Sequence, residues 1–183
     1  EVFAIEPNSR RLEYALEHGV DHGFPLEEAI SAVSASTGGV GVDSVLVTAG
    51  SRDTSPLQLA TEIVRDRGSV VLLGSVPIEL KREPMYDKEI EFRVSRSYGP
   101  GRYDLDYEER GLDYPIGYVR WTEKRNMEAI LGLIARGALS LDHLIDELVP
   151  VDEAEAAYSR LVAPDDDKAP LGAIVLAYDT SDG

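Results

Sequence analysis

Hydrophobic and polar residues follow two different patterns in the first hundred positions. Nearly continuous apolar runs, each short enough for one strand, occur at residues 2–6, 43–50 and 68–74, and residues 91–98 resemble one more strand. Between these runs, apolar residues recur at helical spacing in segments at residues 9–18, 26–37 and 55–64. Buried strands that alternate with amphipathic helices are typical of a parallel sheet covered on both faces. The pattern therefore predicts an α/β fold.

Capping residues mark the ends of the predicted helices. Asn8 is a suitable N-cap for the first helix, and Gly19 stands where a glycine commonly ends one. Gly38 and Gly39 follow the second helix in the same way. Pro56 suits the first turn of the third helix, because the backbone N–H that proline lacks has no partner there. We therefore expect the helices to begin and end close to these residues.

The pattern changes after residue 98. Residues 98–121 hold five of the nine tyrosines and the single tryptophan, interleaved with Gly, Pro, Arg and Asp. A strong amphipathic helix is predicted from Thr122 to Gly137. A strand, a helix and a last strand are predicted at residues 144–149, 152–161 and 172–178. An acidic loop at 165–167 and a polar tail at 179–183 flank the last strand.

Charge and cysteine content narrow the classes of function. The net charge of −16 argues against a nucleic-acid partner, because phosphate binding needs a basic surface. No cysteine is present and the three histidines are scattered, so we expect no metal site from this chain and a reducing, cytoplasmic setting. No apolar run reaches the roughly 20 residues that a membrane helix needs. We therefore expect neither nucleic acid nor a membrane as a partner.

Arginine greatly outnumbers lysine among the basic residues. The four lysines are Lys81, Lys88, Lys124 and Lys168, so arginine supplies the rest of the 18 positive charges. An acidic, lysine-poor surface suits a protein that stays soluble in concentrated salt, and a GC-rich genome gives the same bias. Both explanations stay open, and a salt titration of stability distinguishes them.

Four stretches carry the features of one protein family. They are Val2–Glu6 followed by Arg11–Ala15 and Gly19, Gly41–Gly50, Arg67–Gly74, and Leu133–Tyr158. In this order they resemble strands and helices of the nucleotide-binding domain of medium-chain, zinc-type alcohol dehydrogenases. The resemblance implies a Rossmann-like, doubly wound parallel sheet. It also implies an NAD(P)-dependent oxidoreductase acting on an alcohol, a polyol or a sugar-like small molecule.

Two features of that family fall outside the chain. The glycine-rich turn G-x-G-x-x-G joins the family's first strand to its first helix, whereas Gly38–Gly41 precedes a strand and is no substitute. The family draws its zinc ligands mainly from an N-terminal domain. We therefore expect a sheet that lacks its first strand and glycine-rich turn, with zinc only in the missing N-terminal domain. Alone, the chain is expected to bind NAD weakly or not at all and to be inactive.

The resemblance also predicts the domain organisation. Residues 1–143 would form a truncated NAD(P)-binding domain with residues 98–121 as an aromatic and arginine-rich insertion, and residues 144–183 would return to the catalytic domain. The first strand is central in the order 3-2-1-4-5-6, so its loss leaves two unpaired strand edges. Three alternatives remain open: the edges close up directly, another chain supplies the strand, or the chain is a remnant of a longer protein.

A second resemblance rests on the segments at residues 98–104 and 113–128. They are similar to bi-domain oxidoreductases that join an alcohol-dehydrogenase-like half to a Gfo/Idh/MocA-type dehydrogenase half. This resemblance implies a second half that is absent from the sequence.

The candidate cofactor residues follow strands. Glu6 ends the strand after which this fold places an acid that binds the adenosine ribose hydroxyls. An acid there repels a 2′-phosphate, so the resemblance implies NAD over NADP, and Arg11 could temper that preference. The loops after two later strands would line the cofactor cleft, through Thr48, Ala49, Gly50, Gly74, Ser75 and Val76. A surface acid and simple turns are the alternative interpretations.

The segment after residue 98 holds the candidate substrate residues. Arginine grips carboxylate or phosphate, and aromatic rings stack on sugar faces. The candidates are Arg102, Tyr103, Tyr118, Arg120, Trp121, Arg125 and Asn126. The same residue types are typical of subunit contacts, and this interpretation is the favoured one because no general base stands out. A homodimer through the strand at 91–97 is the expected assembly.

Overall fold

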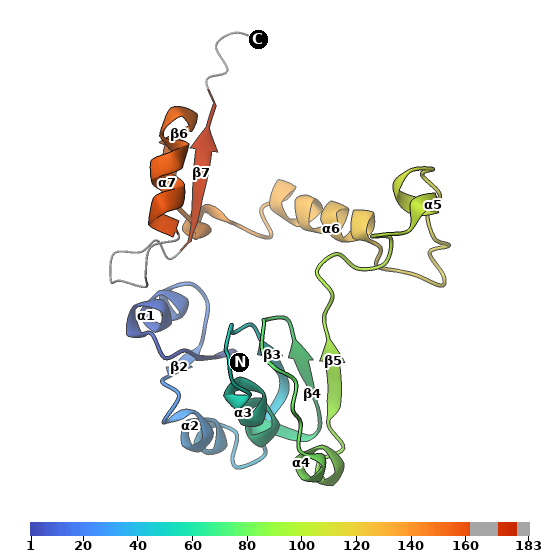
Figure 1. Cartoon of the computed structure of the whole chain (residues 1–183). Helices are drawn as coiled ribbons and strands as arrows, with labels where there is room; N and C mark the ends of the chain where they lie inside the picture. Colours follow the sequence, from blue (N-terminus) through green and yellow to red (C-terminus); the bar gives the residue numbers. More distant parts are fainter. Residues whose placement is uncertain (162–171, 179–183) are drawn as a thin grey trace. The chain divides into compact units, whose positions relative to one another are not determined.

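The computed structural model describes residues 1–161 and 172–178. It divides into two compact units, Glu1–Thr122 and Glu123–Gly183, which we describe separately (Figure 1). The expected division into domains at residues 1–143 and 144–183 stays a prediction. The predicted acidic loop at 165–167 and the polar tail at 179–183 lie outside the described residues.

The first unit alternates strands and helices along the chain. Its elements are β1 (Phe3–Ile5), α1 (Ser9–Glu17), β2 (His22–Phe24), α2 (Ala29–Ser36), β3 (Val42–Val47), α3 (Ser55–Ile63), β4 (Val64–Leu72), α4 (Arg82–Asp87), β5 (Glu91–Val94) and α5 (Leu105–Glu108). β1 pairs with β2, and β3, β4 and β5 form a second sheet in that order. Every one of these pairs is parallel. The predicted parallel α/β fold is confirmed.

The capping signals in the sequence fix the observed ends of α1. The side chain of Asn8 accepts a hydrogen bond from the backbone N–H of Arg11 at 3.1 Å, as an N-cap does. Gly19 follows the helix with φ +106°, a conformation that favours glycine. These local rules act within one turn of the chain, which is why the sequence alone predicts them.

Helix α3 has a C-terminal cap that comes from a distant residue. The Lys88 ammonium donates hydrogen bonds to the backbone carbonyls of Thr61, Glu62 and Val64 at 2.8–2.9 Å. Carbonyls at the end of a helix lack partners within the helix, and a cation there also offsets the negative end of the helix dipole. Lys88 therefore ties the segment between α4 and β5 to the end of α3.

The core of the first unit lies between α3 and the sheet of β3, β4 and β5. Its buried members come from these elements and from the segments beside them. They are Val47, Leu57, Ala60, Val64, Val70, Leu72, Val76 and Ile90. Val64 and Val70 are among the largest side chains that are fully buried, and both belong to β4. Burial of apolar side chains on this scale is the main source of the unit's stability.

The facing edges of the two sheets have no partner strand among the described residues. The Glu6 N–H bonds to the Phe24 carbonyl, so in a parallel ladder the neighbouring Ile5 directs its backbone groups away from β2. The Leu73 N–H bonds to the Val47 carbonyl, and by the same alternation Leu46 directs its groups away from β4. β1 and β3 do not pair with each other. Direct closure of the gap, one of the three alternatives, is therefore wrong.

The second unit contains a helix and a small parallel sheet. Its elements are α6 (Glu123–Ala135), a 3-10 turn at Asp142–Leu144, β6 (Ile145–Pro150), a second 3-10 turn at Val151–Glu153, α7 (Ala154–Leu161) and β7 (Ala173–Ala177). β6 and β7 pair in parallel, and α7 packs against β6. Among the residues that the structure describes, no helix has the length and apolar character needed to cross a membrane.

Three elements were not predicted, and one strand begins earlier than predicted. β2 and α5 are only three and four residues long, and α4 contains a proline within six residues. β4 begins at Val64 and includes the charged residues Arg65, Asp66 and Arg67, whereas the apolar run suggested a start at Gly68. Arg65 pairs with Asp43 of β3 at 2.6 Å, which keeps this polar stretch beside its neighbour.

Replacement of Leu57 by alanine tests the position of the core. Leu57 is 0% exposed, so the change should lower the free energy of unfolding by about 2–5 kcal/mol. Leu46 is 63% exposed, so Leu46→Ala is the matched control and should cost no more than about 1 kcal/mol. Urea unfolding followed by circular dichroism measures both values. Equal losses would show that the core does not lie where we place it.

Candidate functional site

The loops that follow β3 and β4 lie together at the carboxyl edge of their sheet. The backbone N–H groups of Leu73 and Gly74 both donate to the Val47 carbonyl at 2.9 Å. The Ser51 N–H donates to the Ser75 carbonyl at 3.0 Å, which joins the two loops directly. Open α/β sheets bind their ligands beyond the carboxyl ends of the strands. The structure thus brings the predicted loop residues together at the edge where a ligand is expected.

The two glycines at this edge have different roles. A Cβ on Gly74 would overlap with the backbone of Thr48 and Ala49, so Gly74 is needed for one loop to pack on the other. A Cβ on Gly50 would meet nothing within 4 Å. Gly50 therefore leaves open space beside the backbone, as the close approach of a ligand requires. The sequence could not distinguish these two roles.

The remaining residues of these loops differ in exposure. Thr48, Ala49 and Ser75 are exposed, which leaves their polar groups accessible. Val76 is only 8% exposed and belongs to the core cluster, so its side chain packs in the core. Asp53, in the loop after Ser51, accepts a hydrogen bond from the Ser55 N–H at 2.8 Å. Hydrogen bonding to Ser55 lowers the pKa of Asp53, so this carboxylate stays charged at neutral pH.

Glu6 lies immediately beyond the carboxyl end of β1. One of its carboxylate oxygens accepts a hydrogen bond from the Asn8 N–H at 3.0 Å, which orients the side chain at the start of α1. Glu6 is partly exposed, and Arg11 lies one turn further along, in the exposed first half of the helix. The structure therefore places an oriented carboxylate where the fold places the ribose-binding acid.

The candidate Arg102 is engaged within its own segment. Its guanidinium forms an ion pair with Glu108, and that contact lowers the pKa of the Glu108 carboxyl. The same guanidinium carbon lies 4.5 Å from the ring centre of Tyr103 and 5.6 Å from that of Tyr98. Arg102 thus has a carboxylate and two aromatic neighbours already. It is less able to grip a ligand than the sequence suggested.

A second group of contacts closes the same segment. The Tyr114 hydroxyl donates a hydrogen bond to Asp104, and the rings of Tyr107 and Tyr114 stack with centres 5.6 Å apart. The hydroxyl lowers the pKa of Asp104, and the carboxylate in turn raises the pKa of Tyr114. Asp104 also caps α5, because it accepts from the backbone of Asp106 at 3.0 Å. The segment is therefore held by its own side chains.

The other candidates of this segment belong partly to the first unit and partly to the second. Tyr118 is 92% exposed, and Trp121 is half exposed with the Arg120 guanidinium 4.2 Å from its ring centre. Arg125 and Asn126 belong to α6 in the second unit. The structure groups Arg102 with Tyr103, and Arg120 with Trp121, as two separate pairs. Sequence reasoning missed Glu108, Asp104 and Arg96, whose contacts join residues that are not neighbours in the sequence.

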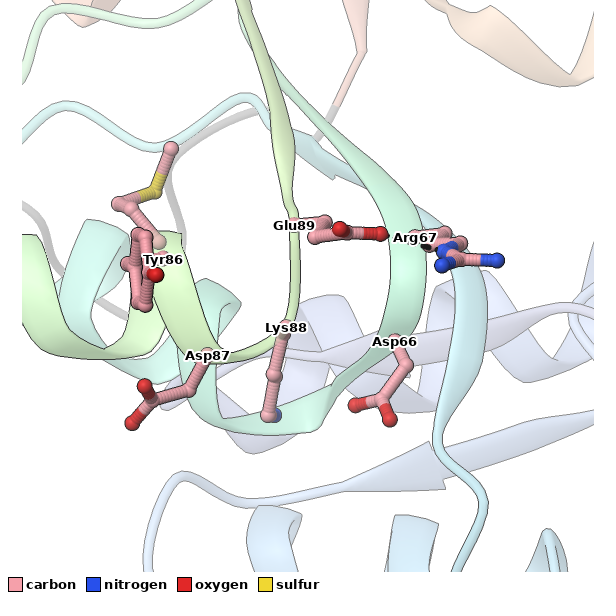
Figure 2. A pocket seen from close by; sticks show the side chains of 7 residues that line it. Asp66, Arg67, Tyr86, Asp87, Lys88 and Glu89 are labelled. Carbon is pink, nitrogen blue, oxygen red and sulfur yellow. Dashed lines mark hydrogen bonds and ion pairs between the residues drawn. The ribbon is translucent and has the colours of Figure 1, made fainter.

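A hollow of about 850 Å³ lies at the opposite, amino edge of the sheet, between the start of β4 and the turn before β5 (Figure 2). Arg67 and Glu89 form an ion pair at 2.5 Å across it, and the Arg67 N–H donates to the Lys88 carbonyl at 2.6 Å. Arg67 and Glu89 both have positive φ values, 57° and 50°. Arg67, Glu89 and Lys88, which line the hollow, thus make contacts that hold the strand ends and the end of α3 together.

The described residues offer no set of zinc ligands. Within the described parts of the chain, no three residues of the types His, Cys, Asp or Glu lie close enough to hold a metal ion. The sequence contains no cysteine. A zinc site of the kind that the family uses does not fit this donor set, so the metal would have to be held by residues other than these.

The pH dependence of the 98–121 segment follows from its carboxylates. Asp104 and Glu108 have lowered pKa values, so their contributions to stability are complete above the unfolded values of about 3.9 and 4.3 and are lost as pH falls further. Tyr114 has a raised pKa, so its contribution to stability is present below about pH 10 and is lost above it.

Replacement of Tyr114 by phenylalanine tests the contact between Tyr114 and Asp104. Carboxyl titration by NMR should show that the pH midpoint of the Asp104 titration rises in Tyr114→Phe. Tyr118→Phe is the matched control, and an equal midpoint in both variants would contradict the contact.

Comparison with known proteins identifies a family that matches the first part of this chain. Residues 1–109 match the family model described as "Zinc-binding dehydrogenase". D-arabitol-phosphate dehydrogenase of Enterococcus avium is 24% identical over 163 residues, which are 86% of this chain and 39% of the relative.

Solved structures share the fold of this chain. The alcohol dehydrogenase TADH of Thermus sp. ATN1 matches with a TM-score of 0.68 and 23% identity, over 97% of this chain and 44% of that one. The alcohol dehydrogenase rspB of E. coli CFT073, solved with NADH, matches with a TM-score of 0.71 and 17% identity over the same shares. The chain thus spans about two-fifths of the length of these proteins. Because the family model matches more than half of its residues, the chain belongs to the zinc-binding dehydrogenase family.

Proposed function

We propose that this chain forms most of the cofactor-binding domain of an NAD(P)-dependent, zinc-type dehydrogenase that acts on an alcohol, polyol or sugar-like substrate. The observation that carries the proposal is the joined pair of loops at the carboxyl edge of β3 and β4, with open space beside Gly50. Membership of the zinc-binding dehydrogenase family supports it. The similar proteins named as D-arabitol-phosphate and alcohol dehydrogenases support the substrate class.

The cofactor is NAD rather than NADP in this proposal. Glu6 carries the preference, because its carboxylate accepts hydrogen bonds from ribose hydroxyls and repels a 2′-phosphate. The Asn8 N–H uses one lone pair of the carboxylate and leaves others for the ribose. Arg11 is the residue most able to weaken the preference, since it follows Glu6 by less than two helical turns.

The rest of the catalytic apparatus comes from residues other than these. The described residues hold no zinc ligand set, and the chain spans about two-fifths of its relatives' length. Binding of NAD by this chain alone is therefore weak, and the chain alone is inactive. Three further features of the parent protein stay predictions: its assembly as a dimer, its cytoplasmic setting, and a second half of the Gfo/Idh/MocA type.

The effect of Glu6 on cofactor preference tests the proposal. Titration of the chain with NADH and with NADPH, followed by NMR, should show NADH binding more tightly. Glu6→Ala should reduce that preference by about tenfold, which corresponds to roughly 1.4 kcal/mol. Glu13→Ala is the matched control, because Glu13 lies on α1 away from the end of β1. If NADH caused no shifts in the loops that contain Ser51 and Ser75, the result would contradict the proposed cofactor site. Dehydrogenase turnover by this chain alone would contradict its proposed inactivity.

An assembly module is the second candidate function, and the outer edge of β5 favours it. The Ser95 N–H donates to the Leu72 carbonyl, so the backbone groups of Val94 point away from β4. No described strand pairs with that edge. An exposed strand edge is a template for pairing with a second chain. In this function two copies would pair through β5.

Val94→Pro tests pairing through this edge. Proline removes only an N–H that has no partner inside the unit, so the fold should keep its stability to within about 1 kcal/mol. A dimer formed through β5 should become monomeric, because the substituted strand is unable to donate at this position. Light scattering over a range of concentrations measures the change, with Val94→Thr as the control. A wild-type chain that is monomeric at every concentration would remove the basis of this function.

A further inference from the structure

A cluster of two arginines and two tyrosines follows the carboxyl end of β5. It consists of Arg96, Tyr98, Arg102 and Tyr103, and we refer to it as the Arg–Tyr cluster. The guanidinium carbon of Arg96 lies 5.3 Å from the ring centre of Tyr103, and that of Arg102 lies 4.5 Å from the same centre. Two cations therefore share the ring of Tyr103. Each is attracted by the ring, and each repels the other.

The acidic residues of this segment neutralise only one of these two cations. Glu108 pairs with Arg102, and Asp106 pairs with Arg110 at 2.6 Å. Asp104 is held by the Tyr114 hydroxyl and by the backbone of α5. Within the described residues, Arg96 has no carboxylate partner, although the sequence holds 34 acidic residues against 18 basic ones. The cluster thus keeps one uncompensated positive charge in a strongly acidic protein.

The backbone of Tyr103 gives a second, independent observation. Its φ is 68°, in the left-handed region that residues other than glycine seldom occupy. Tyr103 is 67% exposed, so burial of this residue does not compensate for the strain. Residues kept in unfavourable backbone conformations concentrate at functional sites. Here the strained residue is also the one whose ring meets both guanidinium groups.

The position of the cluster relates it to the proposed cofactor edge. The Ser95 N–H donates to the Leu72 carbonyl at 2.8 Å, so Arg96 leaves the sheet at the carboxyl end of β5, beside β4. The loops after β3 and β4 leave the sheet at this same edge. A ligand on the Arg–Tyr cluster would therefore lie at the ligand-binding edge of the sheet and not at the hollow of its amino edge.

We propose that Arg96 and the exposed ring of Tyr103 bind a hydroxylated ligand that carries an anionic group, either a phosphate or a carboxylate. Arg96 supplies two or more N–H donors and the charge that the anion needs, and the ring stacks on the C–H face of the sugar or polyol. Arg102 stays paired with Glu108 and keeps Tyr103 in place. This assignment rests on the proposed dehydrogenase function and names the chemical class of its substrate. It moves the anion-binding role from Arg102, which the sequence suggested, to Arg96.

The experiment is an NMR titration of the ¹⁵N-labelled 183-residue chain without any nicotinamide cofactor. The probes are D-arabitol phosphate, D-arabinonate, neutral D-arabitol and inorganic phosphate. Saturable shifts at the Arg96 side chain and at the Tyr103 amide are expected with the first or the second probe, and the tighter of the two identifies the anionic group. Neutral D-arabitol and inorganic phosphate should each bind at least tenfold more weakly. Equal binding of all four probes, or of inorganic phosphate and D-arabitol phosphate, would overturn the assignment.

Variants separate the roles of charge and backbone strain. Arg96→Gln should weaken binding by at least tenfold, whereas Arg93→Gln, an exposed arginine on β5, should leave it unchanged. Tyr103→Gly should weaken binding without lowering the melting temperature, because glycine relieves the left-handed strain. A Tyr103→Gly chain that melts earlier and binds normally would show that the ring serves packing only, and it would overturn the proposal.

Two further outcomes are informative. Shifts at Arg96 that grow with protein concentration in the absence of any probe would make the cluster a subunit contact, and they would also overturn the proposal. Because the titration contains no NADH, its result does not depend on cofactor binding. Loss of the NADH effect at Glu6 with anion binding intact would refute the cofactor proposal alone, and the reverse result would refute the Arg–Tyr assignment alone.

Discussion

Strand β4 holds the first unit together, because it has hydrogen-bonded partners on both of its edges. β3 lies on one side and β5 on the other, both parallel to it. Its side chains Val64, Val70 and Leu72 also supply much of the core under α3. Since parallel partners bring the carboxyl ends of strands to one side, the loops after β3 and β4 and the segment that leads to the Arg–Tyr cluster all leave the sheet at the same edge.

The two edges of this sheet use polar groups in opposite ways. At the amino edge, Arg67 pairs with Glu89 and Lys88 caps α3, so these three charged side chains contact groups within the unit. At the carboxyl edge, the contacts between the loops are made by backbone groups, such as the Ser51 N–H and the Ser75 carbonyl. Side chains such as Thr48 and Ser75 stay exposed. More polar groups are therefore available to a ligand at the carboxyl edge, although the hollow of about 850 Å³ lies at the other edge.

Local rules explain which parts of the fold were predictable. Asn8, Gly19 and the apolar runs act over a few residues, and α1, α3, β3 and most of β4 follow from them. The strand β2 has only three residues, among them His22, and its pairing with β1 depends on contacts across α1, so no local pattern identifies it.

The same distinction holds for the candidate site. The positions of Glu6, Gly50 and Ser75 after predicted strands indicated the carboxyl ends of those strands, where the structure places all three, and their role in binding a cofactor stays a prediction. The separate roles of Gly74 and Gly50, the burial of Val76 and the pairing of Arg102 with Glu108 depend on distances between segments, which a sequence does not contain.

The unpaired edges of β1 and β3 give the physical basis for the proposed weak binding of a dinucleotide by this chain alone. Glu6 ends β1, and the loop with Gly50 follows β3, so the distance between the two depends on how the two sheets are held relative to each other. No backbone ladder joins the sheets among the described residues, and α2, which follows β2 in the chain, packs on α3. Helix packing lacks the fixed hydrogen-bond register of a strand ladder, so it defines that distance less sharply. A strand between β1 and β3 would satisfy the outward backbone groups of Ile5 and Leu46 and fix the spacing of the cofactor residues in one step. This geometry is the physical reason to expect weak binding by the chain alone, although the chain holds most of the proposed cofactor residues.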